Sequence, residues 1–135
     1  MKAKVIIEKG IDGGYDARMK VSDKLDFWLL GQGNTVNEAI NDFYHTRDDM
    51  KALYAEQGKY FPENLEFSFE YDLASFLAFY TNYFSLAGLS RLTGIHQGQL
   101  SHYVTGKRNP SRQTIEKIDK SIHGFAENLS QVQFV

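Results

Sequence analysis

Residues 84–111 read FSLAGLSRLTGIHQGQLSHYVTGKRNPS, and this stretch decides the fold of the C-terminal half of the chain. Two short helical patterns flank a tight turn at Thr93-Gly94-Ile95. The second pattern stops at Gly106, and a basic segment that contains proline follows at once. This layout is that of a helix-turn-helix, whose second helix enters the major groove of DNA. The alternative is a plain two-helix hairpin with a polar outer face. Such a hairpin would not explain why the turn and the basic segment occur together at this spacing.

The spacing of the apolar residues predicts how the two helices meet. Leu89 precedes Ile95 by six residues and Leu100 follows it by five, so the three side chains can form one apolar wedge. Gly94 fits a turn that needs a positive φ, where a Cβ would be strained. Ser90 is small enough for close contact between the helices.

The second helix carries short, polar and mostly uncharged residues between its apolar positions. Glutamine can pair bidentately with adenine, serine can bond to either kind of base edge, and glycine lets the helix approach closely. Basic residues just beyond the helix suit phosphates, which position a protein without reading sequence. We therefore predict that DNA is contacted by Gln97, Gly98, Gln99, Ser101, His102, Lys107 and Arg108.

The segment from about Leu73 to Phe125 resembles the lambda-repressor-like, or XRE-type, helix-turn-helix domain. Leu86 stands where many such domains have a glutamine that contacts phosphate. Helix-turn-helix repressors bind two half-sites about one helical turn apart. We therefore expect a homodimer, or a higher even oligomer, on double-stranded operator DNA.

Length and charge bound the remaining possibilities. The 135 residues allow one ordinary domain or two small ones. Residues 1–72 hold nine Lys and Arg against fourteen Asp and Glu (−5), whereas residues 73–135 hold six against three (+3). This asymmetry fits a module for a basic protein joined to a module for nucleic acid, although chance variation in small counts gives similar numbers. The lack of cysteine excludes disulfides and thiolate metal sites. With no signal peptide or membrane-spanning run apparent, we expect a cytoplasmic protein.

The front half alternates apolar and polar residues with period 2, which predicts strands. Ala3, Val5 and Ile7 would share one face of the first strand, at residues 1–9. Asp12-Gly13-Gly14 is a hairpin turn signal. Further strands are predicted at residues 15–21, at residues 26–30 (the most fully buried) and at residues 65–71.

A helix is predicted from Thr35 to Gln57, after a glycine turn at Gly31-Gln32-Gly33-Asn34. Thr35 would be its N-cap and Glu38 would reach back in a capping box. Its apolar stripe would consist of Ile40, Phe43, Met50 and Leu53. The predicted fold is α+β, with a βββαβ domain at residues 1–72 followed by an all-helical domain at residues 73–135.

This order of motifs resembles the HicB antitoxin family. The matching stretches are Val5-Ile6-Ile7-Glu8-Lys9, Asp12-Gly13-Gly14-Tyr15 and Gly31-Gln32-Gly33-Asn34-Thr35-Val36-Asn37-Glu38-Ala39-Ile40. The resemblance implies a partial RNase H-like front domain, a C-terminal DNA-binding domain and a small ribonuclease toxin, with a catalytic histidine, as partner. The stretch from Val21 to Asp26 lacks the Leu-Pro-Gly-Cys-like sequence of many members.

Several patterns that can carry chemistry are interpreted as structural. Gly31-Gln32-Gly33 lacks the third glycine and the parallel βαβ frame of a dinucleotide loop. Glu8, Glu66 and Glu70 lie on predicted strands, where they can equally face solvent or a partner. No two of the four histidines are four residues apart, and no cysteine completes a metal site. We therefore predict no enzyme activity, no metal and no cofactor.

The last helix should be capped by Ser111 and should present Ile115, Ile118, Ile122 and Phe125 on one face. Apolar residues continue to the end of the chain at Leu129, Val132, Phe134 and Val135. Because free termini usually fray, such a tail should dock either on its own chain or on a second copy.

Three hypotheses follow. The first is an antitoxin that sequesters a small basic ribonuclease toxin and represses its own operon. Its partner surface would include the exposed sheet face and the loops near Glu8, Asp12, Tyr15 and Asp16. The second is a stand-alone helix-turn-helix regulator whose front domain senses a ligand or dimerises. The third is a nuclease, but this sequence offers no convincing cluster of acidic residues for such an activity.

Overall fold

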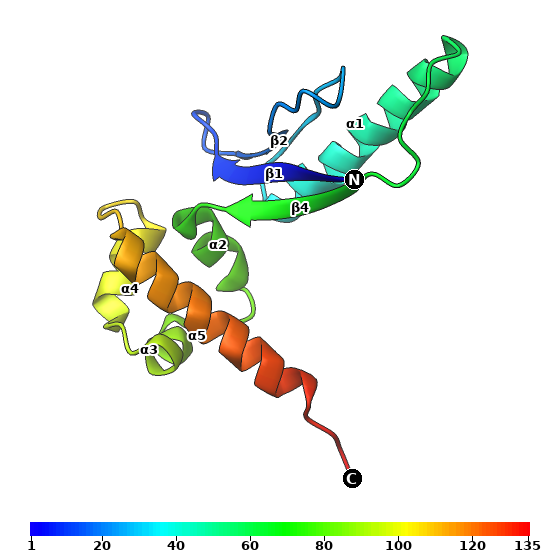
Figure 1. Cartoon of the computed structure of the whole chain (residues 1–135). Helices are drawn as coiled ribbons and strands as arrows, with labels where there is room; N and C mark the ends of the chain where they lie inside the picture. Colours follow the sequence, from blue (N-terminus) through cyan, green and yellow to red (C-terminus); the bar gives the residue numbers. More distant parts are fainter. The chain divides into compact units, whose positions relative to one another are not determined.

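The computed structural model describes residues 1–135 and divides them into two compact units, Met1–Ser75 and Phe76–Val135 (Figure 1). The first unit contains the strands β1 (Lys2–Lys9), β2 (Tyr15–Met19), β3 (Leu30–Gly33) and β4 (Glu66–Tyr71) and the helix α1 (Val36–Glu56). Helix α2 (Leu73–Tyr80) crosses the boundary, and the second unit contains α3 (Leu86–Thr93), α4 (Gln97–Val104) and α5 (Arg112–Ser130). The chain is therefore α+β, and the predicted order βββαβ ahead of a helical region is confirmed.

The first unit is a four-stranded mixed sheet in the order β3-β2-β1-β4. The β1–β2 and β2–β3 pairs are antiparallel, and β4 pairs with β1 in parallel. The parallel pair follows from the chain path, because α1 carries the chain across one face of the sheet before β4 begins (Figure 1). The core lies between this face and α1, and its fully buried residues include Val5, Ile7, Ala17, Met19 and Phe43.

The third predicted strand is wrong in position. Residues 26–29 form no strand, and β3 instead begins at Leu30 and runs through Gly31, Gln32 and Gly33, which the sequence predicts to be a turn. Trp28 is half exposed, and its indole Nε1 donates to the carbonyl oxygen of Met19 at 2.5 Å. The amide of Met19 still donates to the carbonyl oxygen of Leu29 at 3.0 Å, and the regular ladder of β2 and β3 begins at Arg18 and Leu30. The predicted second strand is also too long, because Val21 lies beyond β2 and is exposed.

Glycines in β3 allow α1 to pack directly on the strand. A Cβ on Gly31 would overlap the carbonyl oxygen of Ala39 and the amide nitrogen of Phe43. A Cβ on Gly33 would likewise meet Glu38 at the start of the helix. These glycines therefore mark a close approach between helix and strand rather than a turn.

The N-terminus of α1 is capped nearly as predicted. The Thr35 hydroxyl accepts from the amide of Glu38 at 3.1 Å, and the Glu38 carboxylate accepts from the amide of Asn34 at 2.8 Å. The reciprocal bond thus reaches one residue further back than a standard capping box. Together the two bonds satisfy donors that the first turn of a helix would leave unpaired.

The buried face of α1 differs from the predicted stripe, because its buried residues are Val36, Ala39, Phe43 and Tyr54. Leu53 is exposed. The Tyr54 hydroxyl donates to the Asp26 carboxylate at 2.6 Å, and its ring packs edge-on against Phe27. The hydrogen bond to Asp26 raises the pKa of the Tyr54 hydroxyl. Near the end of α1, Tyr54 is therefore the buried residue instead of its neighbour Leu53.

In the second unit, α3 packs against both α4 and α5. As predicted, Ser111 caps α5, and its hydroxyl accepts from the amide of Thr114 at 3.2 Å. Ile118 is the buried residue of α5, whereas Ile115 and Phe125 remain partly exposed. No helix of the structure combines the length and the apolar character needed to cross a bilayer.

Two glycine substitutions should have opposite effects on stability. Gly31→Ala should lower the free energy of unfolding by about 1–3 kcal/mol, because the new methyl group has no room beneath α1. Gly124→Ala, in α5, should raise it by about 0.5–1 kcal/mol, because its Cβ meets no atom within 4 Å and alanine favours the helix.

Denaturant unfolding would measure both changes. Fluorescence of the single tryptophan, Trp28, reports on the first unit, and far-ultraviolet circular dichroism reports on the helices. A neutral or stabilising Gly31→Ala would contradict the close packing of α1 on β3.

Candidate nucleic-acid interface

The first helix of the helix-turn-helix is bounded by local chemistry at both ends. The Ser85 hydroxyl caps α3 by accepting from the amide of Gly88 at 2.9 Å. Gly94 ends the helix in the left-handed region (φ 74°, ψ 8°), and its amide donates to the carbonyl oxygen of Ser90. Because only glycine adopts this conformation without strain, the chain reverses at this residue.

Two hydroxyl groups hold the turn. The Ser90 hydroxyl donates to the carbonyl oxygen of Ile95 at 2.6 Å. The Thr93 hydroxyl donates to the carbonyl oxygen of Leu89 at 2.7 Å and accepts from the amide of Ile95 at 3.2 Å. Thr93 is buried, so each of these bonds satisfies a group that water cannot reach. From the sequence alone, Ser90 is predicted only to allow close packing, and no role is predicted for the hydroxyl of Thr93.

The predicted apolar wedge is confirmed. Leu89, Ile95 and Leu100 are all buried, and Tyr103 is buried beside them. Leu89 comes from α3, Ile95 from the turn and Leu100 from α4, so the wedge fixes the two helices relative to each other. This packing leaves the opposite face of α4 free to meet a ligand.

The N-terminus of α4 is capped by a residue that the sequence analysis missed. The Nδ1 atom of His96 accepts from the amide of Gly98 at 3.3 Å. A histidine at a helix start that lacks Ser, Thr, Asp or Asn was the available signal. His96 therefore contributes to the position of α4.

The predicted DNA-facing residues of α4 do not all lie on one face. Gln97 and Gly98 are exposed, and Ser101 and His102 are half-buried on the turn that follows. Gln99 lies on the flank of the helix, where its side-chain amide donates to the Tyr103 hydroxyl at 2.6 Å. The structure thus places Gln97, Gly98, Ser101 and His102 on one side of α4. Gln99 is instead hydrogen-bonded to Tyr103, which is buried.

The basic segment at Lys107 and Arg108 follows directly after α4. Gly106 has a positive φ of 75°, which turns the chain after the helix. The amide of Arg108 donates to the carbonyl oxygen of His102 at 3.2 Å, so the loop is fastened to the recognition helix. The side chains of Lys107 and Arg108 are exposed. On the other side of the motif, the Lys117 ammonium group lies close to Gly94.

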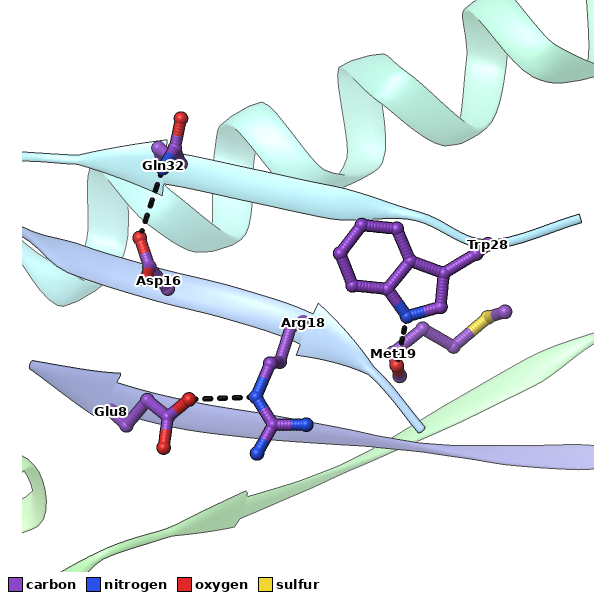
Figure 2. Close-up of polar contacts among 6 residues, drawn as sticks. All are labelled: Glu8, Asp16, Arg18, Met19, Trp28 and Gln32. Carbon is purple, nitrogen blue, oxygen red and sulfur yellow. Dashed lines mark hydrogen bonds and ion pairs between the residues drawn. The ribbon is translucent and has the colours of Figure 1, made fainter. Parts of the chain in front are cut away.

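The other predicted surface, in the first unit, lies partly on the sheet face away from α1 (Figure 2). Glu8 and Asp16 are directly opposite each other on β1 and β2. Arg18 donates to Glu8 at 2.6 Å, and the Gln32 side chain donates to Asp16 at 3.2 Å. These bonds offset the repulsion of two facing carboxylates.

Asp12 and Tyr15 lie apart from that pair. Asp12 is in the hairpin turn, where its carboxylate accepts from the amide of Gly14 at 3.0 Å. Tyr15 is paired with Lys9 and Gly33, on the same side of the sheet as α1. The four predicted partner residues therefore do not form one continuous patch on the sheet.

Two of the three carboxylates considered for catalysis, Glu8 and Glu70, are also paired. Glu70 lies between Lys4, at 3.0 Å, and Lys20, at 3.1 Å. Hydrogen bonds from these two lysines lower the pKa of the Glu70 carboxyl. No group of three His, Asp or Glu side chains converges closely enough to hold a metal ion.

The family described as Helix-turn-helix (HTH_3) matches residues 82–122, which span α3, α4 and the first part of α5. No curated protein and no solved structure matches the chain significantly. Residues 82–122 are thus an XRE-type helix-turn-helix, which is a DNA-binding domain. This domain implies a role in transcriptional regulation.

Substitutions at the interface should separate sequence reading from phosphate binding. Gln97→Ala should weaken binding to the preferred site by about 1–3 kcal/mol and relax sequence preference, because its amide is free to pair with a base edge. Lys107→Ala should weaken binding to all sequences and lower the salt slope of log K by about one. Fluorescence anisotropy over a salt series measures both effects.

Gln113→Ala provides the matched control, because Gln113 is an exposed glutamine on α5 outside the α4 face. It should bind as the unaltered chain does. If Lys107→Ala changed the sequence preference and Gln97→Ala did not, the two roles would be reversed.

Proposed function

We propose that the chain is a dimeric transcriptional repressor that also serves as the antitoxin of a type II toxin–antitoxin pair. In this proposal α4 reads the operator, and the first unit sequesters a small basic ribonuclease toxin. The observation that carries the DNA-binding part is the geometry of the turn at Gly94. There, three buried apolar residues and two hydroxyl groups fix α4 with Gln97, Gly98, Ser101 and His102 on its outer side.

The antitoxin part is supported by the first unit. Its βββαβ order and its motifs resemble the HicB family, and residues 1–72 carry a formal charge of −5. A ribonuclease that grips RNA phosphates presents positive charge, and complementary charge speeds encounter and screens out wrong partners. An inhibitor needs only to cover the catalytic residue of the toxin, so this unit requires no chemistry of its own.

A stand-alone regulator, whose first unit senses a ligand or dimerises, is the second candidate. One observation favours it. Glu8 and Glu70 on the sheet are already paired with Arg18 and with two lysines, so of these carboxylates only Asp16, which accepts from the neutral Gln32, keeps an uncompensated negative charge. The two candidates share the DNA interface and differ only in what binds the first unit.

Co-expression with the product of a neighbouring reading frame distinguishes them. If that product is a basic protein of roughly domain size, the full chain should co-purify with it and restore growth to cells that express it. The double charge reversal Asp12→Lys with Asp16→Lys should abolish both effects and leave operator binding unchanged. Asp49→Lys with Glu56→Lys, on exposed positions of α1, changes the charge equally and should leave rescue intact. If no neighbouring product binds the chain, the stand-alone regulator replaces the antitoxin.

A further inference from the structure

The two edges of the four-stranded sheet differ in how their backbone groups are satisfied. Strand β3 forms one edge and β4 the other. At the β3 edge, side chains of α1 bond to the backbone groups that point away from the sheet. The Asp42 carboxylate accepts from the amide of Gln32 at 2.8 Å, and the Thr46 hydroxyl donates to the carbonyl oxygen of Leu30 at 3.2 Å. This edge is therefore closed to a further strand.

The edge formed by β4, which lies beside β1, has no such cover (Figure 1). The amide of Glu66 donates at 3.0 Å to the residue before β1, and the amide of Asp72 donates to the carbonyl oxygen of Ile7 at 3.3 Å. Backbone groups of successive residues in a strand point to opposite sides, so those of Phe67 and Phe69 point away from β1. No other strand and no side chain bonds to them.

The sequence of β4 also lacks the usual protection of an edge strand. It reads EFSFEY, without lysine, proline or glycine. Edge strands of natural proteins are commonly protected by lysine, by proline or by a bulge, because free donors and acceptors on a strand are a template for another strand. The β4 edge is therefore open to β-strand addition, in which an extended segment of another molecule continues the sheet.

The two faces of β4 define which segment fits. On the face toward α1, the ring of Phe67 lies 4.9 Å from that of Phe43 and 6.1 Å from that of Tyr44. The ring of Phe69 also lies 6.1 Å from Tyr44. Both phenylalanines are only partly buried. Because neighbouring strands lie about 4.8 Å apart, side chains of an added strand would pack directly beside these rings. Apolar residues fit this face.

The opposite face of β4 is acidic. It carries Glu66, Ser68 and Glu70, all of which are exposed. Glu70 is held by its two lysines, whereas Glu66 forms no ion pair, although Lys2 is its register partner on β1. An added strand would therefore meet an uncompensated carboxylate at Glu66. A basic residue fits this face, since opposite charges on neighbouring strands attract.

A second copy of this chain is a poor occupant of the same edge. Antiparallel pairing of two β4 strands about Ser68 would set Glu66 of each copy opposite Glu70 of the other. Pairing about Phe69 would set Glu66 opposite Asp72, and pairing about Glu70 would set that residue opposite itself. Like charges directly opposite each other destabilise a sheet, so each of these registers is disfavoured.

We propose that the outer edge of β4 binds an extended segment of a partner protein as a fifth strand of the sheet. The segment is apolar on the side toward α1 and basic on the other side. Main-chain bonds to Phe67 and Phe69 supply affinity, and the alternation of its side chains supplies specificity. This inference rests on the proposed function only in taking the partner to be a basic protein.

The probe is an acetylated and amidated peptide that alternates valine and lysine over about eight residues, a usual length for a strand. Bound to about nine-tenths of the full, isotope-labelled chain, it should slow exchange of the Phe67 and Phe69 amide hydrogens by about ten-fold. The amide of Gln32, which is already bonded to Asp42, should not change. A peptide of alternating valine and glutamate should bind at least about five-fold more weakly.

Two variants at one position separate the backbone from the side chain. Phe67→Val removes the ring and keeps the outward amide, whereas Phe67→Pro removes both. Proline is tolerated at an edge where its missing N–H faces solvent, so both variants should keep the fluorescence of Trp28. Phe67→Pro should bind the valine–lysine peptide about ten-fold more weakly than Phe67→Val does.

Three results would overturn the inference: equal binding by Phe67→Pro and Phe67→Val, equal binding of the two peptides, or slow exchange of the Phe67 and Phe69 amides in the free chain. The last would mean that the edge is already covered. Rescue of cells that express the neighbouring product is a separate readout. Protection by the peptide without rescue would retain the β4 edge and refute the antitoxin role. Rescue that persists in Phe67→Pro would retain that role and overturn docking on β4.

Discussion

The DNA-binding half of this protein depends on one backbone reversal, at Gly94. A residue with a Cβ would lose about 1–2 kcal/mol in this left-handed conformation. The hydroxyl groups of Ser90 and Thr93 bond across the turn, and a net contribution of about 0.5–1.5 kcal/mol is typical of each such bond. Leu89, Ile95 and Leu100 then bury the space between the helices. Without this reversal, α4 would have no fixed position from which to present polar side chains.

The first unit is organised by an analogous constraint, the close approach of α1 to β3. Gly31 and Gly33 remove the side chains that would hold the helix away from the strand. The resulting core is shared by α1 and one face of the sheet, which leaves the other face to polar and charged residues. Those residues form a paired network rather than a cluster of free acids, as the bonds of Glu8 (Figure 2) and of Glu70 show. A partner of this face would meet specific ion pairs and not a uniform negative field.

Local chemistry was the part of the structure that the sequence predicted well. Strand alternation at Ala3, Val5 and Ile7, the N-caps Thr35 and Ser111, and the glycine turn at Gly94 all follow from interactions within a few residues. The predictions that failed mostly concern positions whose structure depends on residues far away in the sequence. Gly31 looked like a turn residue because its strand conformation depends on contact with α1.

The same holds for α1, where Tyr54 is buried and Leu53 is exposed because Asp26 and Phe27, far away in the sequence, receive the hydroxyl and the ring of Tyr54. In α4, the sequence located the recognition helix and its polar residues. The bond from Gln99 to Tyr103 is a local exception: the two residues are one turn apart, but water can serve as the partner of either side chain, so residue type and spacing do not predict the bond. Residue type and spacing therefore locate an interface, while the hydrogen bonds of each side chain decide what it can read.

The most direct test of the claim that α4 reads DNA is amide chemical-shift mapping of the full, isotope-labelled chain during titration with a duplex selected for binding. The account predicts the largest shifts at residues 97–102 and 106–108, and small shifts throughout β1 to β4. Shifts concentrated on the strands, or none at α4, would contradict it.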